Sequence, residues 1–345
     1  MKKLLILCLL VCSCFSSQGV FAAAVDEPKE CPKDLRYALG LYYGNGEQFL
    51  LRENNGELEL LYRYSQDGYT FAKSNRYPLL KERFDSYTIN ESGPLTKTEA
   101  AVRLERNPDG YAITCKVGGN RYSRSFFPGE GEKAFRFAEP QEPWDTLVKN
   151  AAEAEMPDNL TTGKTAVLVN LPDVLAGAHY DLRYATFDNC FGKAITTRPG
   201  AYLDAEAAAA LARVEAELHT YGYGLLIWEA YRPWSVSKLA YDALPADKKG
   251  MLPSPEKGFS HNTGRAVDVS MYYLDTGEPV AMISDFDEPS IRQYSAYAGG
   301  TTLQRYQRAL LQHSMLREGF QKSAAEWWHF EYGNIAEFAH LNEQL

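Results

Sequence analysis

Short apolar stretches alternate with turn sequences between about residue 37 and residue 137. Leu58–Tyr62 and Tyr111–Thr114 are rich in leucine, aromatic or β-branched residues, and turn sequences such as Asn54–Gly56 and Asn107–Gly110 precede them. A spacing of about ten residues between turns is typical of antiparallel hairpins. The pattern therefore predicts a small β-rich domain, either a barrel or a sandwich.

The second half of the chain mixes helical and strand periodicities. Leu211, Val214 and Leu218 recur at helical spacing behind Asp204, a residue type that favours helix N-termini. The predicted elements are a helix over 205–220, a strand over 223–228, a helix from Pro233 towards 243, a strand over 265–274, a helix over 303–318 and a strand over 327–332. No regular alternation of parallel strands and crossover helices is visible. We therefore expect an α+β domain with an antiparallel sheet.

The two patterns divide the chain into four parts. We expect a signal peptide over 1–24, a β-rich accessory domain over 25–138, a linker with a short helix over 139–160, and a catalytic domain over 161–345. No motif with a catalytic spacing occurs in the β-rich part. Its tyrosines could form a face that binds cell-wall material, or they could belong to its core.

The N-terminus has the features of an export signal. Lys2 and Lys3 precede the apolar run Leu4–Phe15, and small residues at Ala22–Ala24 offer a cleavage site. The run is shorter than the ~20 residues that a membrane span needs. We therefore expect a periplasmic or otherwise exported protein with no membrane span after cleavage. An uncleaved anchor and a lipoprotein are the alternatives.

Composition and charge narrow the functional class. The chain is 45% hydrophobic and 23% charged, which is ordinary for a globular protein and excludes a disordered or collagen-like one. Its net charge of −9 makes a nucleic-acid partner improbable. Of six cysteines, Cys31, Cys115 and Cys190 remain after cleavage. A disulfide between Cys31 and Cys115 is one option in an oxidising compartment, and the sequence leaves it open.

Two segments combine metal-ligating residues. His261 stands seven residues before Asp268, with Gly264 between them to allow a turn. Glu326 stands three residues before His329 in an aromatic stretch. Two histidines and one carboxylate form a common catalytic zinc set, and a further glutamate beside the site can act as general base. Either pair alone could be coincidental, and the HExxH motif is absent.

A third segment supplies a cation. Arg232 follows the buried strand expected over 223–228 and precedes Pro233, where a helix should begin. A guanidinium fixed at such a junction can stabilise negative charge that develops on a carbonyl oxygen. A surface ion pair is the simpler interpretation when the segment is considered alone.

Taken in order, these segments resemble the D-alanyl-D-alanine dipeptidases, a family of zinc metallopeptidases. The resemblance spans roughly residues 165–335. It rests on Tyr184–Asn189, Tyr231–Pro233, the His261/Gly264/Ala266/Asp268 pattern, Phe286–Asp287 and Glu326–His329. It implies one Zn²⁺ per chain, held by His261, Asp268 and His329. Glu326 would then be the base and Arg232 the transition-state stabiliser. Asp287 would be the partner of the substrate ammonium, and Tyr184 and Ser260 would be further substrate-binding residues.

Two positions depart from the family pattern. The family usually has a serine two residues before the first zinc histidine, where this chain has Phe259; Ser260 adjoins the histidine instead. Cys190 interrupts the usual Asn-Phe pair. Both changes lie where they could alter selectivity without touching the metal ligands.

The resemblance implies an exported dipeptidase that hydrolyses D-Ala-D-Ala. The alternatives are a zinc D,D-carboxypeptidase or endopeptidase acting on peptidoglycan stem peptides, and a non-catalytic zinc-stabilised binding module. Glu326 and Arg232 argue against the last, because a structural zinc site needs neither a base nor a cation.

Overall fold

The structure is a computed structural model that describes residues 26–62, 76–96, 99–130, 135–196 and 200–345. The expected signal peptide lies outside these residues. Among the helices of the described chain, none combines the length and apolar character that crossing a membrane requires.

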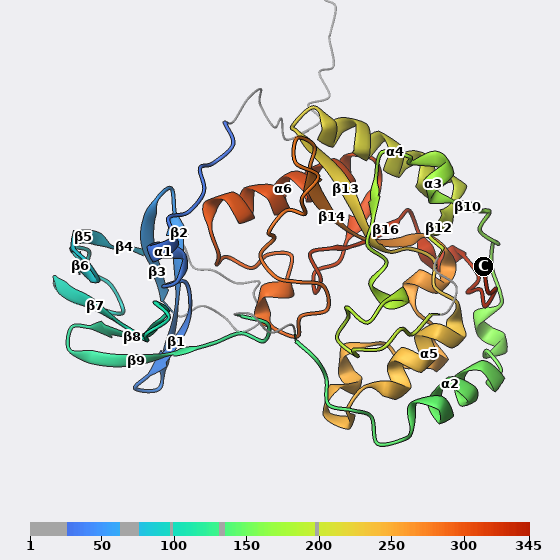
Figure 1. Ribbon diagram of the computed structural model, residues 1–345, viewed down its shortest axis with the longest axis horizontal. Helices are drawn as coiled ribbons and strands as arrows, with labels where there is room; N and C mark the ends of the chain where they lie inside the picture. Colours follow the sequence, from blue (N-terminus) through green and yellow to red (C-terminus); the bar gives the residue numbers. More distant parts are fainter. Residues whose placement is uncertain (1–25, 63–75, 97–98, 131–134, 197–199) are drawn as a thin grey trace, which may run out of the picture.

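The N-terminal region forms one antiparallel sheet of nine strands behind the short helix α1 (Lys33–Arg36) (Figure 1). The strands are β1 (Gly40–Gly44), β2 (Glu47–Asn54), β3 (Glu57–Tyr62), β4 (Arg76–Pro78), β5 (Leu80–Arg83), β6 (Ser86–Ile89), β7 (Ala100–Arg106), β8 (Ala112–Val117) and β9 (Asn120–Ser125). Their order across the sheet is β4-β3-β2-β1-β9-β8-β7-β6-β5.

This order makes the sheet barrel-like. The two edge strands, β4 and β5, are separated along the chain by Leu79 alone, so the sheet must curl until its edges approach each other. Side chains of the inner face, including Tyr42, Phe49 and Tyr122, are completely or almost completely buried. The prediction of antiparallel hairpins is confirmed, and of the two expected architectures the barrel-like one is present.

The C-terminal half contains a five-stranded sheet in the order β11-β13-β14-β16-β15. Its strands are β11 (His179–Tyr180), β13 (Tyr223–Glu229), β14 (Ala266–Tyr273), β15 (Phe320–Lys322) and β16 (His329–Tyr332), and a separate pair consists of β10 (Leu168–Asn170) and β12 (Tyr202–Asp204). All pairings are antiparallel except that of β11 with β13. The mixed α/β architecture with antiparallel sheets is therefore as expected.

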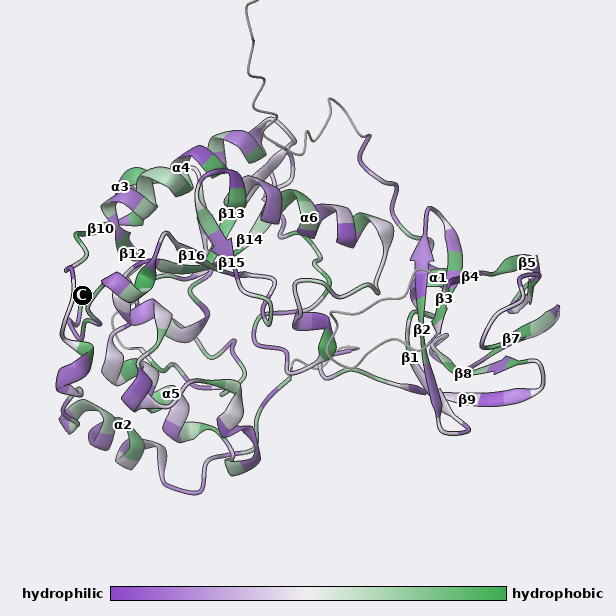
Figure 2. Cartoon of the chain, turned by 180° about the vertical axis from the view of Figure 1, so that it is seen from behind, coloured by the Kyte–Doolittle hydropathy of each residue, from purple (hydrophilic) through white to green (hydrophobic). Residues whose placement is uncertain are grey.

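Helices cover this sheet. They are α2 (Trp144–Glu153), α3 (Leu171–Val174), α4 (Ala205–His219), α5 (Trp234–Ala243) and α6 (Thr302–Arg317). Figure 1 shows α4 and α6 on one side of β13 and β14, with α5 and α2 on the other, and the hydropathy colours of Figure 2 show hydrophobic segments on the inward sides of the helices. The helix α2 lies in the segment expected to be a linker with a short helix.

Local sequence explains where the main helices begin. The Asp204 carboxylate accepts a hydrogen bond from the backbone amide of Glu206 and caps α4, as its residue type predicts. Thr301 and Gln304 form a reciprocal capping box at α6. Because every residue of β13 is buried, this strand forms the centre of the C-terminal half.

The three cysteines within the described residues are not paired. Cys31, Cys115 and Cys190 are buried free thiols. The disulfide between Cys31 and Cys115, considered from the sequence, is therefore absent from the structure.

Candidate metal centre and substrate cavity

A cavity of about 390 Å³ opens at the ends of the central strands. Its lining includes all eight residues that the sequence singled out: Tyr184, Arg232, Ser260, His261, Asp268, Asp287, Glu326 and His329. These residues come from segments up to 145 positions apart in the chain, between Tyr184 and His329. The fold thus gathers the separate motifs into one site.

The sheet register brings three polar residues into one row. Glu229 of β13 pairs with Asp268 of β14, and Asp268 pairs with His329 of β16. Directly paired residues project from the same face of a sheet, so all three side chains are directed to one side. An irregularity in the β13–β14 pairing next to Glu229 changes the register at this level.

His261 reaches the row from a short 3₁₀ helix, Ser260–Thr263. The helix ends at Gly264, whose φ of 71° lies in the left-handed region. A Cβ atom there would lie 2.4 Å from the Leu168 side chain, so the turn requires glycine on both conformational and steric grounds. The sequence prediction of a turn between His261 and Asp268 is confirmed.

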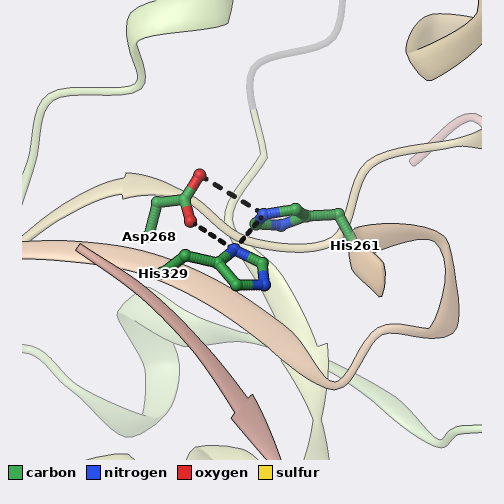
Figure 3. Close-up of side chains that lie close together, drawn as sticks. All are labelled: His261, Asp268 and His329. Carbon is green, nitrogen blue, oxygen red and sulfur yellow. Dashed lines mark hydrogen bonds and ion pairs between the residues drawn. The ribbon is translucent and has the colours of Figure 1, made fainter. Parts of the chain in front are cut away.

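His261, Asp268 and His329 approach one another closely (Figure 3). His261 Nε2 lies 3.2 Å from His329 Nδ1 and 3.3 Å from Asp268 Oδ2, and His329 Nδ1 lies 2.8 Å from Asp268 Oδ1. All three side chains are at least nine-tenths buried. One ligand atom from each can therefore face a common point, as a bound cation requires.

The outer hydrogen bonds of the two histidines fit a metal site. His261 Nδ1 lies 2.7 Å from the Ala230 carbonyl oxygen, which can only accept, so Nδ1 carries the proton and the Nε2 lone pair faces the centre. His329 Nε2 lies 3.2 Å from Ser260 Oγ and 3.3 Å from Glu331 Oε1, which leaves Nδ1 directed inward. Such partners orient metal-binding histidines in proteins. The donor set, two imidazoles and one carboxylate, suits Zn²⁺.

Electrostatics also favours a cation at this point. Burial lowers the pKa of His329, but hydrogen bonds to Asp268 and Glu331 outweigh burial and raise that pKa to about 10. Although burial opposes the ionised form of Asp268, the two neighbouring histidines hold its pKa well below the usual range. The three side chains thus hold a positive charge strongly, and a divalent cation would take the place of the proton.

Arg232 is fixed beside this centre. Its guanidinium is buried, and its Nε atom donates a hydrogen bond to Ser237 Oγ at 2.8 Å. It lies 5.1 Å from the centre of the Tyr184 ring, and its Nη1 atom is 3.9 Å from the Glu229 carboxylate. These contacts hold the guanidinium in one orientation, as a group that stabilises developing charge must be held.

Two glutamates in this part of the protein have strongly raised pKa values. Burial is the main cause for both, and it raises the pKa of Glu229 to about 8 and that of Glu326 to about 7. A carboxyl group whose pKa lies near neutrality can accept and return a proton at little cost, which a general base requires. Of the two, Glu326 lines the cavity that contains the metal-binding residues.

Asp287 also lines the cavity. Its Oδ2 atom accepts hydrogen bonds from the Tyr184 hydroxyl at 2.7 Å and from the Cys190 thiol at 3.6 Å. Its φ of 53° is left-handed, a conformation uncommon for residues other than glycine, asparagine and aspartate. Burial raises the pKa of Asp287 to about 6 despite the hydrogen bond from Tyr184. A charged partner, such as an ammonium group, would stabilise the ionised carboxylate.

Comparison with known proteins identifies the family. The family model described as D-ala-D-ala dipeptidase matches residues 164–344. Curated relatives named D-alanyl-D-alanine dipeptidase are 36% identical over 179 residues in Enterococcus faecalis, 33% over 184 residues in Enterococcus faecium and 29% over 181 residues in Escherichia coli K12. The alignments cover 47%, 46% and 52% of this chain and 89%, 88% and 92% of these relatives.

The chain belongs to the D-Ala-D-Ala dipeptidase family. It is therefore a metallopeptidase, and the resemblance found in its motifs is confirmed. The match covers the C-terminal half, whereas the nine-stranded sheet lies outside it.

The sequence did not identify every residue of this dipeptidase site. Glu229 was visible only as the residue three before Arg232, and its place in the row with Asp268 depends on strand register. Glu331, which contacts His329, was likewise missed. Its position two residues after His329 in a strand was the available signal, because alternate residues share a face. Phe259 packs in a small hydrophobic cluster with Leu160 and Trp234.

Proposed function

We propose that this protein is an exported, zinc-dependent dipeptidase that hydrolyses D-Ala-D-Ala to two molecules of D-alanine. The observation that carries this proposal is the shared cavity, which is lined by a three-ligand cation site, a carboxylate of raised pKa, a fixed guanidinium and a second half-buried carboxylate. The names of the curated relatives supply the substrate.

In this proposal His261, Asp268 and His329 hold one Zn²⁺. When bound, zinc lowers the pKa of a water molecule and polarises a carbonyl group. Each of the three residues would supply one donor atom to the ion.

Glu326 and Arg232 carry out the remaining chemistry of the peptide bond. A Glu326 carboxylate oxygen accepts the proton of the attacking water and returns it to the nitrogen of the leaving D-alanine as the C–N bond breaks. Arg232 balances the negative charge that develops on the carbonyl oxygen. Water adds across the peptide bond, so the products are one new carboxylate and one new amino group.

Asp287 selects the length of the substrate. Its carboxylate would pair with the free ammonium of a dipeptide, and the Tyr184 hydroxyl holds that carboxylate in place. A substrate extended at its amino end lacks this charge and would leave Asp287 without a partner, which is costly for a half-buried charge.

The test compares D-Ala-D-Ala with its N-acetylated analogue, using metal-loaded protein. We expect hydrolysis of the free dipeptide and little action on the blocked one. Rapid cleavage of the blocked peptide, with none of the free dipeptide, would instead establish a D,D-carboxypeptidase or endopeptidase. A wider dipeptide library then defines which side chains are accepted.

We further propose that residues 1–24 direct export and that 25–138, 139–160 and 161–345 are the accessory domain, linker and catalytic domain. An exported dipeptidase meets D-Ala-D-Ala released from the cell wall, which favours scavenging. Protease accessibility in intact cells and spheroplasts tests this. Protection of the protein in spheroplasts would refute export.

A further inference from the structure

The N-terminal region has no assigned role, and within the described residues the lining of the catalytic cavity begins only at Tyr184. Several of its contacts with the catalytic half nevertheless lead to the segments that contain Asp287 and Tyr184, two residues of the cavity lining. Leu41, Leu50 and Leu61 form a row across β1, β2 and β3, since Leu41 pairs with Leu50 and Leu50 with Leu61. All three belong to the hydrophobic core of the catalytic half rather than to that of the nine-stranded sheet.

Polar contacts from β2 anchor the start of α6. The Glu53 carboxylate is buried and accepts a hydrogen bond from the Thr302 backbone amide at 2.6 Å, within the first turn of α6. The Arg305 guanidinium donates to the Glu53 carbonyl oxygen at 2.9 Å, and Arg52 donates to the Ala298 carbonyl oxygen at 3.0 Å. The segment that leads from Asp287 to α6 is therefore fixed to the N-terminal sheet at its far end.

A second group of contacts reaches the residue next to Asp287. The Phe127 ring lies beneath the Arg292 guanidinium at 5.2 Å and meets the Tyr297 ring edge-on at 6.3 Å. Arg292 in turn binds the buried Glu288 carboxylate, with its Nε atom 2.8 Å from Oε1. Glu288 directly follows Asp287, so this chain of contacts ends one residue from the carboxylate of the cavity.

Residues 135–137 contact the segment that contains Tyr184 and Cys190. The Phe137 backbone amide donates to the Cys190 carbonyl oxygen at 2.7 Å, and its ring lies 5.6 Å from that of Phe191. Phe191 lies 6.3 Å from the Tyr184 ring. Arg136 donates to the Phe187 carbonyl oxygen at 3.3 Å. The same segment thus supports both residues that hydrogen-bond Asp287, namely Tyr184 and Cys190.

We propose that the N-terminal region is a positioning element for the subsite that binds the substrate ammonium, and that Phe137 and Glu53 are its positioning residues. This inference rests on the proposed function, because it takes Asp287 as the ammonium partner. The region contacts both segments that meet at Asp287. It contacts the segment from Asp287 to α6 through Phe127 and Glu53, and the segment that contains Tyr184 and Cys190 through Phe137.

The Asp287 carboxylate needs such support because misplacement of a binding group by about 1 Å can cost a large factor in activity. The left-handed backbone of Asp287, with a φ of 53°, is one that aspartate adopts more readily than most residues. The hydrogen-bonded group of Asp287, Tyr184 and Cys190 joins two loops that contain little regular structure of their own. Contacts from the N-terminal region, through Glu53, Phe127 and Phe137, hold these loops from outside the catalytic half.

The experiment measures kcat and KM for D-Ala-D-Ala and for N-acetyl-D-Ala-D-Ala in the full chain. We expect Phe137→Ala to raise KM for the free dipeptide about tenfold, with kcat changed less than about twofold. Glu53→Gln should raise the same KM about threefold, because it weakens only the far anchor. The slow reaction of the blocked peptide, which makes no use of the ammonium subsite, should not change.

Matched variants make the result specific. Phe137→Leu keeps an apolar side chain against Phe191 and should retain most of the wild-type KM. Phe84→Ala removes a 71% exposed ring from the same region and should behave as wild type. An unchanged KM in Phe137→Ala, or an equal loss for both substrates, overturns the positioning role. A wild-type protein that hydrolyses no free dipeptide overturns the proposed function and, with it, this inference.

Discussion

The nine-stranded sheet and the catalytic cavity both contain buried charged side chains, but these charges differ in their partners. In the sheet, Arg52 lies 2.5 Å from Glu59, and both side chains are less than one-tenth exposed. Arg106 lies 2.7 Å from Asp85, and these two side chains are 12% and 15% exposed. Each of these carboxylates is compensated by a guanidinium in direct contact.

In the catalytic half, Glu229 is 3.9 Å from Arg232, too far for a hydrogen bond, and the hydrogen bonds that Asp287 accepts from side chains of the described residues come from the neutral groups of Tyr184 and Cys190. Burial raises the pKa of both carboxyl groups. A compensated buried charge stabilises a fold at best modestly, whereas an uncompensated one destabilises it and persists where function requires it. The difference separates a structural region from a reactive one.

The largest expected effect is that of metal removal. Exhaustive chelation should abolish dipeptide hydrolysis, because Glu326 and Arg232 alone cannot activate water, and added Zn²⁺ should restore it. The measurement is activity against zinc content determined by atomic absorption. Full activity in zinc-free protein would contradict the assignment of His261, Asp268 and His329 as ligands.

The next prediction compares one glutamate from each region. Glu326→Gln should lower kcat by about 10²- to 10⁴-fold while zinc stays bound and the free energy of unfolding does not fall. Glu59→Gln should leave kcat unchanged but cost about 3–5 kcal/mol of stability, because Arg52 is left buried without its partner. Urea unfolding and steady-state kinetics measure both. The proposed difference between the two regions is wrong if both variants lose kcat alone or both lose stability alone.

The third prediction concerns pH. The pKa of Asp287 in the folded protein, about 6, lies above its ordinary value of 3.8, mainly because of burial. The folded state therefore retains this proton more strongly than the unfolded state. The resulting penalty is absent below about pH 4, grows as the pH rises towards 6, and is complete above 6.

Asp287→Asn removes this penalty and tolerates the left-handed backbone equally well. The variant should be more stable than wild type above pH 6 by about 1–2 kcal/mol, allowing for solvent screening, and equally stable below pH 4. It should also lose affinity for the free dipeptide. Urea unfolding across this pH range checks the effect, and parallel pH profiles for the two proteins would refute it.

The smallest expected effect is that of Ser260→Ala. The Ser260 hydroxyl lies 3.2 Å from His329 Nε2, so its loss should weaken zinc binding about tenfold and leave the fully loaded enzyme within about threefold of wild-type kcat/KM. Competition with a zinc chelator measures the affinity. If KM rises and zinc affinity is unchanged, Ser260 binds substrate, as the resemblance implied.

Much of the fold was predictable because local sequence determines it. Asp204 caps the start of α4, Pro233 precedes α5, and the apolar stretch 223–228 forms all but the last residue of the central strand β13. Turn sequences such as Asn54–Gly56 join neighbouring strands of the N-terminal sheet into hairpins. These features depend on capping, backbone conformation and burial, all of which act within a few residues.

The site was predictable in part for a related reason. His261, Asp268, Glu326 and His329 were recognisable because their chemistry is carried by residue type and short spacing. Their meeting in one cavity depends on long-range contacts that no local pattern specifies, such as the register between β14 and β16 that pairs Asp268 with His329. Glu229 joins the row only through the β13–β14 pairing, and for that reason it was missed.

The sequence by itself determined the elements, the metal-binding residue types and the family. Only the tertiary structure decided how the two halves meet. Leu41, Leu50 and Leu61 have the residue type expected in the core of the N-terminal sheet, yet they pack against the catalytic half. A strand has two faces, and its sequence does not say what covers each face. Long-range packing alone brings Phe127 and Phe137 to the loops that hold Asp287.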